Sequence, residues 1–244
     1  MTDRVRQTCV VTGATSGIGR GLTVSLAARG AAVWAVGRTV ERLEPLAVEV
    51  EGLRGKVTPL VADLESEEEV HEASRRILDR TEEVDVLIHA AGAIVLGLVG
   101  SVSPAAFDRL YRVNLRAPFV LTQDLLPALR RARGQVVFIN SSAGLHASPG
   151  NALYAATKHG LKAIADGLRD EVNADGIRVI TVYPGRTATA MQRFVHQHEG
   201  REYRADRLLR VDDVVDVVLA ALSVPQTGEV TDVVVRPMAK LDAH

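Results

Sequence analysis

The chain has 244 residues, with 29 basic and 30 acidic side chains and a formal net charge of −1. Such a balance creates no field that would attract nucleic acid or an anionic membrane, so the expected partner is a small molecule. Cys9 is the only cysteine, which excludes an intrachain disulfide and a CxxC metal or redox motif. The N-terminus has no apolar signal-peptide core, and we expect a cytoplasmic protein.

The predicted elements alternate between short apolar runs and longer amphipathic ones. The predicted strands are Thr8–Thr12, Ala32–Val36, Val57–Val61, Val84–His89, Gln135–Asn140, Ile177–Tyr183 and Thr231–Val235. The predicted helices are Gly17–Arg29, Thr39–Leu53, Ser66–Arg80, Ser103–Arg131, Asn151–Ala174 and Val211–Ser223. Continuously apolar strands are typical of sheets covered on both faces. This order predicts an α/β fold, a single Rossmann-like doubly wound domain over residues 1–244 with a seven-stranded parallel sheet flanked by helices.

Two stretches need a separate interpretation. Residues 86–107 contain no Asp, Glu, Lys or Arg, but glycines and Pro104 interrupt them, so they predict a buried strand and a loop rather than a membrane span. Residues 186–210 are polar and poorly periodic, and we interpret them as a substrate lid. Because open parallel sheets bind ligands beyond the carboxyl ends of their strands, the residues after each strand are the candidates for chemistry.

A glycine-rich turn with the spacing GxxxGxG follows the first predicted strand. Its glycines let the backbone approach a pyrophosphate, and the helix that follows presents free N–H groups. The candidate cofactor contacts in this turn are Gly13, Thr15, Ser16, Gly17, Ile18 and Gly19. An ordinary glycine-rich turn between a strand and a helix would show the same pattern.

Charged residues follow the next two predicted strands. Arg38 lies 19 residues beyond Gly19, where a basic side chain suits the 2′-phosphate of NADP and an acidic one the ribose hydroxyl of NAD. A solvated arginine at a helix start is the alternative. Asp63 and Leu64 follow the third strand, and the Asp63 carboxylate either holds the adenine amino group or caps the helix entering at Ser66.

The fourth and sixth predicted strands end in small or turn-forming residues. Ala91 and Gly92 let a cofactor lie against the strand end, whereas His89 is either a ligand or a structural residue. Pro184 and Gly185 end the sixth strand with a sharp turn. The hydroxyls of Thr187 and Thr189 could then reach a nicotinamide carboxamide, although a plain turn into a polar loop explains either threonine alone.

The fifth predicted strand leads to hydroxyl and amine groups. Ser141 follows the strand, and Tyr154 comes thirteen residues later, at a helix start. Lys158 lies four residues beyond Tyr154 and therefore shares its helix face. An ammonium group beside a phenol should lower the phenol pKa, which is otherwise near ~10, towards neutrality.

In their order along the chain, the residues that follow the predicted strands resemble the sequence motifs of the short-chain dehydrogenase/reductase family, and the resemblance covers nearly the whole chain. The matching residues are Thr12, Gly13, Gly17, Gly19, Ala91, Gly92, Asn114, Ser141, Tyr154, Lys158, Pro184 and Gly185. The chain departs from the family at His89 and Ala90, where Asn-Asn is frequent. Arg38 occupies the position of a basic residue in NADP-preferring members, without a second basic residue at Ala14 to Ser16.

The resemblance implies roles for four residues. Tyr154 would act as general acid in reduction and as general base in oxidation. Lys158 would hold the nicotinamide ribose and depress the phenol pKa. Ser141 would orient the substrate oxygen, and the family's thirteen-residue interval to the tyrosine selects it over Ser142. Asn114 would anchor a water on a proton relay through Lys158.

The expected activity is interconversion of a carbonyl and an alcohol with NADP(H), or alternatively NAD(H), on a small-molecule substrate. A non-catalytic NADP(H)-binding sensor or scaffold is the second hypothesis, and a same-fold epimerase or dehydratase is the third. The resemblance also implies a homodimer or homotetramer, through helices near Asn114–Arg131 and Asn151–Ala174. We expect no metal site, because His196 and His198 lack a clear third ligand and a solvated pair explains them. His146 either faces the substrate or lies on the surface.

Overall fold

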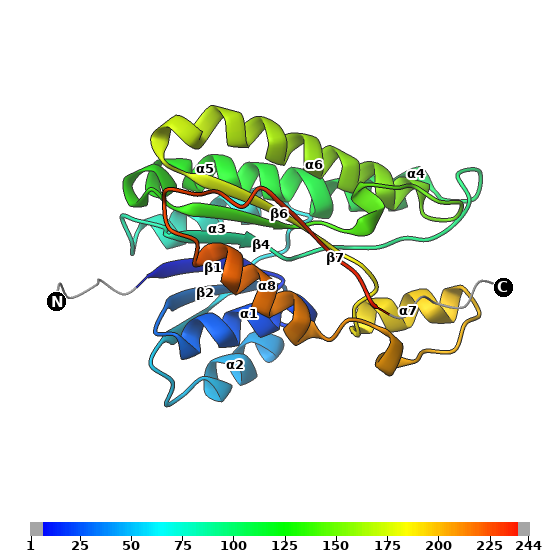
Figure 1. Ribbon diagram of the computed structural model, residues 1–244, viewed down its shortest axis with the longest axis horizontal. Helices are drawn as coiled ribbons and strands as arrows, with labels where there is room; N and C mark the ends of the chain where they lie inside the picture. Colours follow the sequence, from blue (N-terminus) through cyan, green and yellow to red (C-terminus); the bar gives the residue numbers. More distant parts are fainter. Residues whose placement is uncertain (1–6, 239–244) are drawn as a thin grey trace.

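The computed structural model describes residues 7–238, and seven parallel strands form its central sheet (Figure 1). The strands are β1 (Thr8–Thr12), β2 (Ala32–Gly37), β3 (Lys56–Val61), β4 (Val86–His89), β5 (Gln135–Ile139), β6 (Arg178–Pro184) and β7 (Asp232–Val235). Their order in the sheet is β3-β2-β1-β4-β5-β6-β7. The predicted doubly wound Rossmann-like sheet is confirmed. The strand order reverses between β1 and β4, and ligands of such sheets bind at this switch point.

Helices cover both faces of the sheet, as the continuously apolar strands predict (Figure 1). One face carries α1 (Gly17–Ala28), α2 (Val40–Glu49) and α8 (Val211–Leu222), whose apolar side chains share one core cluster with the sheet. The other face carries α3 (Glu67–Leu78), α5 (Ala117–Ala132) and α6 (Ala152–Val172), which share a second cluster. Two buried layers thus hold the strand ends in fixed positions.

The predicted helix Ser103–Arg131 is wrong as a single regular element. The chain forms α4 (Pro104–Tyr111), then one π-helical turn at Arg112–Arg116, and then α5. The π-turn buries Asn114 completely. Single π-turns within α-helices occur frequently at functional sites, because the extra residue re-aims a side chain.

The stretch 186–210 contains a helix that its weak periodicity did not predict. This helix, α7 (Ala190–His198), begins at Thr189, whose hydroxyl accepts from the Gln192 amide at 3.2 Å. The two ends of the stretch are joined by a parallel bridge between Thr187 and Leu209. An ion pair also ties Arg186 to Glu199, with two hydrogen bonds of 2.8 and 2.7 Å. The stretch is therefore a closed loop with its own helix.

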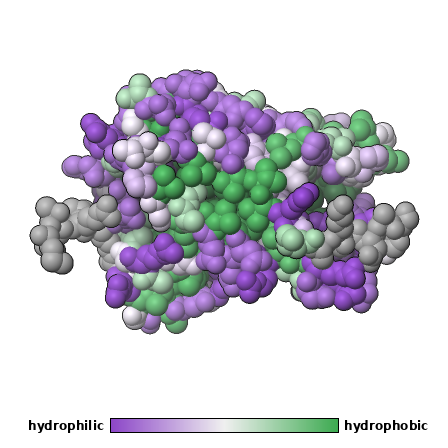
Figure 2. Space-filling view, viewed as in Figure 1, coloured by the Kyte–Doolittle hydropathy of each residue, from purple (hydrophilic) through white to green (hydrophobic). Residues whose placement is uncertain are grey.

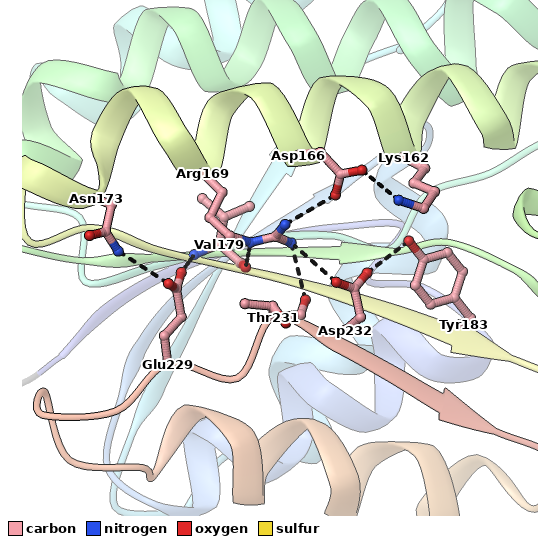
Figure 3. Close-up of polar contacts among 9 residues, drawn as sticks. All are labelled: Lys162, Asp166, Arg169, Asn173, Val179, Tyr183, Glu229, Thr231 and Asp232. Atoms are coloured by element: carbon pink, nitrogen blue, oxygen red, sulfur yellow. Dashed lines mark hydrogen bonds and ion pairs between the residues drawn. The ribbon is translucent and has the colours of Figure 1, made fainter.

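A polar network fastens the edge strand β7 to its neighbours (Figure 3). Arg169 of α6 donates to the carbonyl oxygens of Val179 and Thr231 at 3.1 and 3.2 Å. The Tyr183 hydroxyl donates to the Asp232 carboxylate at 2.9 Å. Beside this network Val234 is 60 % exposed, and Figure 2 shows apolar surface around the middle of the same face. Side-chain bonds thus hold a strand that is paired on one side only.

Over the described part of the chain, residues 7–238, no helix has the length and apolar character required to cross a bilayer. The uncharged run 86–107 instead forms β4, a loop and the start of α4.

Candidate active site

The glycine-rich turn and the β4 end meet at the strand switch point. Gly13 has a φ of 66°, and a Cβ placed on it would lie 2.7 Å from the Ala91 Cα. A Cβ on Gly19 would lie 2.4 Å from the Gly13 oxygen. Only residues without side chains fit these contacts, so the glycines are required by close packing of the turn against β4.

Thr12 locks these two segments together, a role that the sequence analysis did not assign. Its Oγ1 accepts from the amides of Ala90 and Ala91, both at 3.2 Å. The position of Thr12 directly before Gly13 in the glycine motif is the sequence feature from which this role could have been predicted.

The start of α1 fits an anionic group. Ser16 is the N-cap residue, yet its side chain makes no capping hydrogen bond, and none of the first-turn residues is acidic. Neither the side chain of Ser16 nor an acidic residue of the first turn therefore offsets the positive end of the helix dipole, and the first N–H groups can bind an anionic ligand. A Cβ on Gly17 would lie 3.1 Å from the Thr189 Cγ2, so the start of α7 adjoins this turn. Ile18 is partly buried against the core below.

Arg38 follows β2 and is exposed. Its guanidinium forms no hydrogen bond or ion pair with residues 7–238. A Cβ on Gly37 would lie 2.8 Å from the Thr15 Cγ2, so the glycine-rich turn and the β2 end adjoin. A guanidinium that has no partner among these residues and lies beside the glycine-rich turn suits the 2′-phosphate of NADP.

Asp63 does not cap α3, so that alternative is wrong. Ser66 caps the helix itself by accepting from the Glu69 amide at 3.3 Å. Asp63 Oδ1 instead accepts from the Glu65 amide at 3.0 Å, in a turn after β3. Asp63 and Leu64 are half-buried after this strand.

Tyr154 and Lys158 lie on one face at the start of α6, both buried. The Lys158 Nζ is 5.9 Å from the Tyr154 ring centroid and donates to the Ile139 carbonyl at 3.2 Å. A Cβ on Gly92 would lie 3.9 Å from the same Nζ. The ammonium group therefore lies among the ends of β4, β5 and α6.

The electrostatics of the pair differ from the sequence-based expectation. Burial raises the pKa of Tyr154, and a hydrogen bond from Ser141 opposes that rise without reversing it. Burial lowers the pKa of Lys158 to about 8. The pKa of the phenol is therefore not lowered as the sequence predicts, because the desolvation of the buried phenol outweighs the hydrogen bond from Ser141. The phenol is held in its neutral, proton-carrying form.

Ser141 lies beside Tyr154, as the thirteen-residue interval predicts, and Ser142 is exposed. The Ser141 Oγ also accepts from the Ala143 amide at 3.1 Å, which fixes its rotamer at the start of a 3₁₀ turn, Ser142–Gly144. The next residue back, Asn140, holds α6 by donating to the Lys158 carbonyl at 3.1 Å.

Asn114 joins the loop after β4 to the start of α6. Its Oδ1 accepts from the Ala93 amide at 2.7 Å, and its Nδ2 donates to the Ala93 carbonyl at 2.9 Å and to the Thr157 hydroxyl at 3.1 Å. The Thr157 hydroxyl donates in turn to the Tyr154 carbonyl at 2.8 Å. The sequence analysis missed Thr157, although it stands inside the Tyr-x-x-x-Lys motif.

The residues after β6 lie on the same edge of the sheet. The Thr187 hydroxyl donates to the Gly185 carbonyl at 3.0 Å, which closes the turn that Pro184 begins. Thr189 caps α7, so both threonine hydroxyls already have one structural bond.

The histidines lie outside this constellation. His89 is buried, its Nε2 is hydrogen-bonded to the Thr122 hydroxyl at 2.8 Å, and burial lowers its pKa to about 3, so it is a neutral structural residue. His146 is exposed. The solvated His196–His198 pair is wrong: His196 is 1 % exposed and bonds to Gln192, whereas His198 is exposed. Residues 7–238 contain no cluster of three His, Cys, Asp or Glu suited to a metal ion.

Apolar side chains surround the phenol. Tyr154 belongs to a buried cluster with Leu110, Ala143 and Ala155. Five partly buried residues pack against this cluster, namely Ala93, Ile94, Val95, Phe107 and Leu153. Because these five retain some exposure, apolar surface is accessible next to the candidate catalytic group.

A family model for short chain dehydrogenases matches residues 7–200, and the chain belongs to this family of oxidoreductases. The 3-oxoacyl-[acyl-carrier-protein] reductase of Thermotoga maritima is 34% identical over 184 residues, which are 75% of each chain. Nodulation protein G of Rhizobium sp. is 38% identical over 183 residues, 75% of this chain and 74% of that protein.

Solved structures show the same fold. A short chain dehydrogenase from Shigella flexneri, complexed with NADP, superposes with a TM-score of 0.86 at 26% identity, covering 96% of this chain and 98% of that one. A metagenomic short-chain oxidoreductase, also in complex with NADP, gives a TM-score of 0.81 at 28% identity with the same coverage.

Proposed function

We propose that this chain interconverts a carbonyl and an alcohol with NADP(H), with Tyr154 as general acid and base. One observation carries the proposal: Tyr154, hydrogen-bonded to Ser141 and followed one turn later by Lys158, is buried where the β4 and β5 ends meet. A buried phenol with an orienting hydroxyl and a neighbouring amine suits proton exchange with a substrate oxygen.

NADP(H) fits the residues that are present. The N–H groups at Gly13 to Gly19 would hold the pyrophosphate, Arg38 the 2′-phosphate, and Asp63 and Leu64 the adenine. Ala91, Gly92 and Lys158 would contact the nicotinamide ribose, and the turn from Pro184 to Thr189 would contact the carboxamide. When bound, the cofactor supplies or accepts the hydride. Two solved relatives of this fold are complexed with NADP.

The chain's own residues manage the proton and the geometry. In reduction Tyr154 gives its hydroxyl proton to the substrate oxygen, and in oxidation the phenolate takes that proton back. Ser141 donates to the same oxygen and stabilises its developing negative charge. Lys158, whose pKa of about 8 lies near neutrality, can pass a proton towards the phenol. Asn114 is the positioning residue that fixes the start of α6 to the β4 loop.

We also propose that residues 186–210, which we call the lid segment, form a substrate lid on a single domain. Thr189 adjoins Gly17, so the segment begins beside the pyrophosphate position, and α7 follows directly. A lid there would cover the bound dinucleotide and exclude water from the reacting carbon.

The test is the substitution Tyr154→Phe, assayed by NADPH oxidation with a panel of ketones and aldehydes. The panel includes a 3-oxoacyl thioester, the substrate type in the name of the Thermotoga maritima relative. We expect kcat/KM to fall by roughly 10² to 10⁴-fold while the NADPH dissociation constant is unchanged. The matched control, Tyr111→Phe, removes the hydroxyl of an exposed tyrosine on α4 and should leave kcat/KM unchanged.

Undiminished turnover in Tyr154→Phe would overturn the mechanism. NADPH binding without turnover of any panel member would favour the sensor hypothesis instead. A product formed without net NADPH consumption would favour the epimerase or dehydratase.

We further propose a homodimer or homotetramer built through α5 and α6. The outer surfaces of these helices expose Phe119, at 46 %, together with Ala156 and Ala163, so they offer a small-residue surface with an aromatic anchor. Light scattering should give a multiple of the 26.2 kDa chain mass, and Phe119→Glu should reduce it. A monomeric wild-type protein would contradict the proposal.

A further inference from the structure

The accessible surface next to Tyr154 comes from two segments that contain no ionised side chain. Residues 86–107 and 142–157 include no Asp, Glu, Lys or Arg. The two segments are joined by a hydrogen bond from the Gly97 amide to the Gly150 carbonyl at 2.8 Å. They contribute the partly buried residues Ile94, Phe107 and Leu153 around the phenol. A substrate that reaches Tyr154 therefore meets an apolar, uncharged wall.

Two arginines of the lid segment have partners within the segment itself. Arg186 forms its two-bond ion pair with Glu199, and the Arg193 guanidinium stacks 4.5 Å from the centroid of the Tyr203 ring. The exposed apolar residues of α7 are Met191 and Phe194, at 37 % and 48 %. The loop before α4 and α7 itself lie at the same end of the molecule, beyond the carboxyl ends of the strands (Figure 1). The lid segment thus adds the exposed apolar side chains of Met191 and Phe194, while Arg186 and Arg193 are held by partners within the segment.

We infer that the substrate is an uncharged ketone or aldehyde, or the matching alcohol, whose reacting carbon carries an apolar group, and that Ile94, Phe107 and Leu153 bind that group. The inference deepens the proposed function and rests on it. A carboxylate or phosphate held against this wall would lose its hydration without gaining a cationic partner. Each methylene laid on the wall gains transfer free energy equivalent to about fourfold in affinity.

The experiment compares two ketones of matched shape, 4-methylacetophenone and 4-acetylbenzoate, which differ in one charged group. With the wild-type enzyme and NADPH, we expect kcat/KM for the neutral ketone to exceed that for the anion on the order of 100-fold. In a series of 2-alkanones, kcat/KM should rise with chain length. Equal or better use of the carboxylate would overturn the inference.

A binding measurement separates this inference from the proposed function. Both ketones are titrated into NADP-loaded Tyr154→Phe, in which turnover is not needed. If the neutral ketone binds preferentially but the wild-type enzyme reduces no carbonyl, the result would support the apolar site and contradict the proposed reaction. If the enzyme reduces both ketones but prefers the anion, the result would contradict the inference about the substrate and remain consistent with the proposed reaction.

A charge added to the wall should shift the preference. Ile94→Arg should lower the ratio of neutral to anionic kcat/KM by at least about tenfold, because it supplies the missing cation. The matched control is Val48→Arg, on an exposed α2 position that is 62 % accessible, and it should leave the ratio unchanged. If Ile94→Arg fails to fold, Phe107→Ala serves instead and should weaken use of the neutral ketone by about tenfold. An unchanged ratio in Ile94→Arg, or undiminished use of the neutral ketone in Phe107→Ala, contradicts the assignment.

Discussion

The ends of β1, β2 and β4 and the lid segment lie at the same end of the sheet, but different forces hold them. At the strand ends, backbone atoms approach backbone atoms, as at Gly13 and Gly19, and buried core lies directly beneath. The lid segment is held by the exposed ion pair between Arg186 and Glu199, by one bridge at Thr187, and by a few buried residues of its own, among them His196 and Leu209. At Gly13 and Gly19 the first region has no room for an added Cβ, whereas the ion pair of the second region can be removed without adding an atom to a packed contact.

This difference suits the division of labour that we propose. A dinucleotide is the same in every turnover, so its site benefits from a rigid backbone that leaves no alternative geometry. A substrate must enter and leave, so the elements over it need bonds that are individually weak. Substitutions in the two regions should therefore have very different effects on stability and on substrate binding.

The largest effect should come from Gly19→Ala. Its Cβ would lie 2.4 Å from the Gly13 oxygen, and this contact is between backbone and β-carbon, so no flexible side chain can move aside. We expect a loss of about 3 kcal/mol in the free energy of unfolding, measured by urea denaturation, and a large loss of NADPH affinity.

The matched control is Gly100→Ala. No atom lies within 4 Å of a Cβ placed there, so it should leave stability within about 0.5 kcal/mol of the wild type or slightly raise it. A Gly19→Ala protein as stable as this control would show that the strand ends are less tightly constrained than their packing indicates.

The next largest effect should be on cofactor preference and concerns Arg38, a side chain that is exposed although it follows a strand of the closely packed region. Arg38→Asp should reduce the ratio of NADPH to NADH affinity by about 100-fold, because a charge-assisted bond to phosphate is replaced by repulsion. Fluorescence titration with both cofactors measures the ratio. The control Arg29→Asp removes an exposed cation at the C-cap of α1, and should not change the ratio. Equal affinity of the wild type for NADPH and NADH would contradict the proposal that Arg38 binds the 2′-phosphate.

The fold was largely predictable from the sequence, because each strand carries its own apolar run between turn signals. All seven predicted strands exist, with boundaries shifted by at most two residues. The helix from Ser103 to Arg131 was predicted without its π-turn, because that turn is stabilised by bonds from Asn114 to Ala93 and Thr157, which are distant in sequence. No local periodicity encodes such contacts.

The candidate site divides in the same way. Helical spacing predicted that Tyr154 and Lys158 share a face, and the interval typical of the family added Ser141, because a strand end and a helix start fix the positions of all three. The helix α7 was missed, because its short apolar pattern of Met191, Phe194 and Val195 is interrupted by polar residues and its position depends on the Arg186–Glu199 pair. The raised pKa of Tyr154 was missed too, since burial is a property of the folded chain.

A third prediction uses the buried amine of Lys158. Burial lowers its pKa from 10.5 to about 8, so between these values the unfolded chain binds more protons than the folded one. Stability from this group therefore rises with pH across that window. Relative to Lys158→Met, the wild type should gain about 2 kcal/mol between pH 8 and 10 in denaturant titrations. A difference independent of pH would show that the ammonium group stays hydrated.

The smallest effect on stability should come from the lid segment. Burial alone would raise the pKa of Glu199, but the hydrogen bonds and charge of Arg186 outweigh it and hold the pKa below its ordinary value of 4.5. The pair's contribution is then fully present above that value and is lost as the pH falls through the lowered pKa. Glu199→Gln should cost at most about 1 kcal/mol at pH 7, and the difference from wild type should shrink in acid.

The same substitution should raise the substrate KM severalfold while kcat changes little, because a loosened α7 binds substrate less well but leaves Tyr154 in place. Glu49→Gln breaks an exposed pair with Arg20 on the other side of the glycine-rich helix and serves as the control. A KM raised equally by both substitutions would mean that the lid segment has no special part in substrate binding. A Glu199→Gln protein destabilised as much as Gly19→Ala would erase the contrast between the two regions, since the lid segment would then be as integral to the fold as the strand ends.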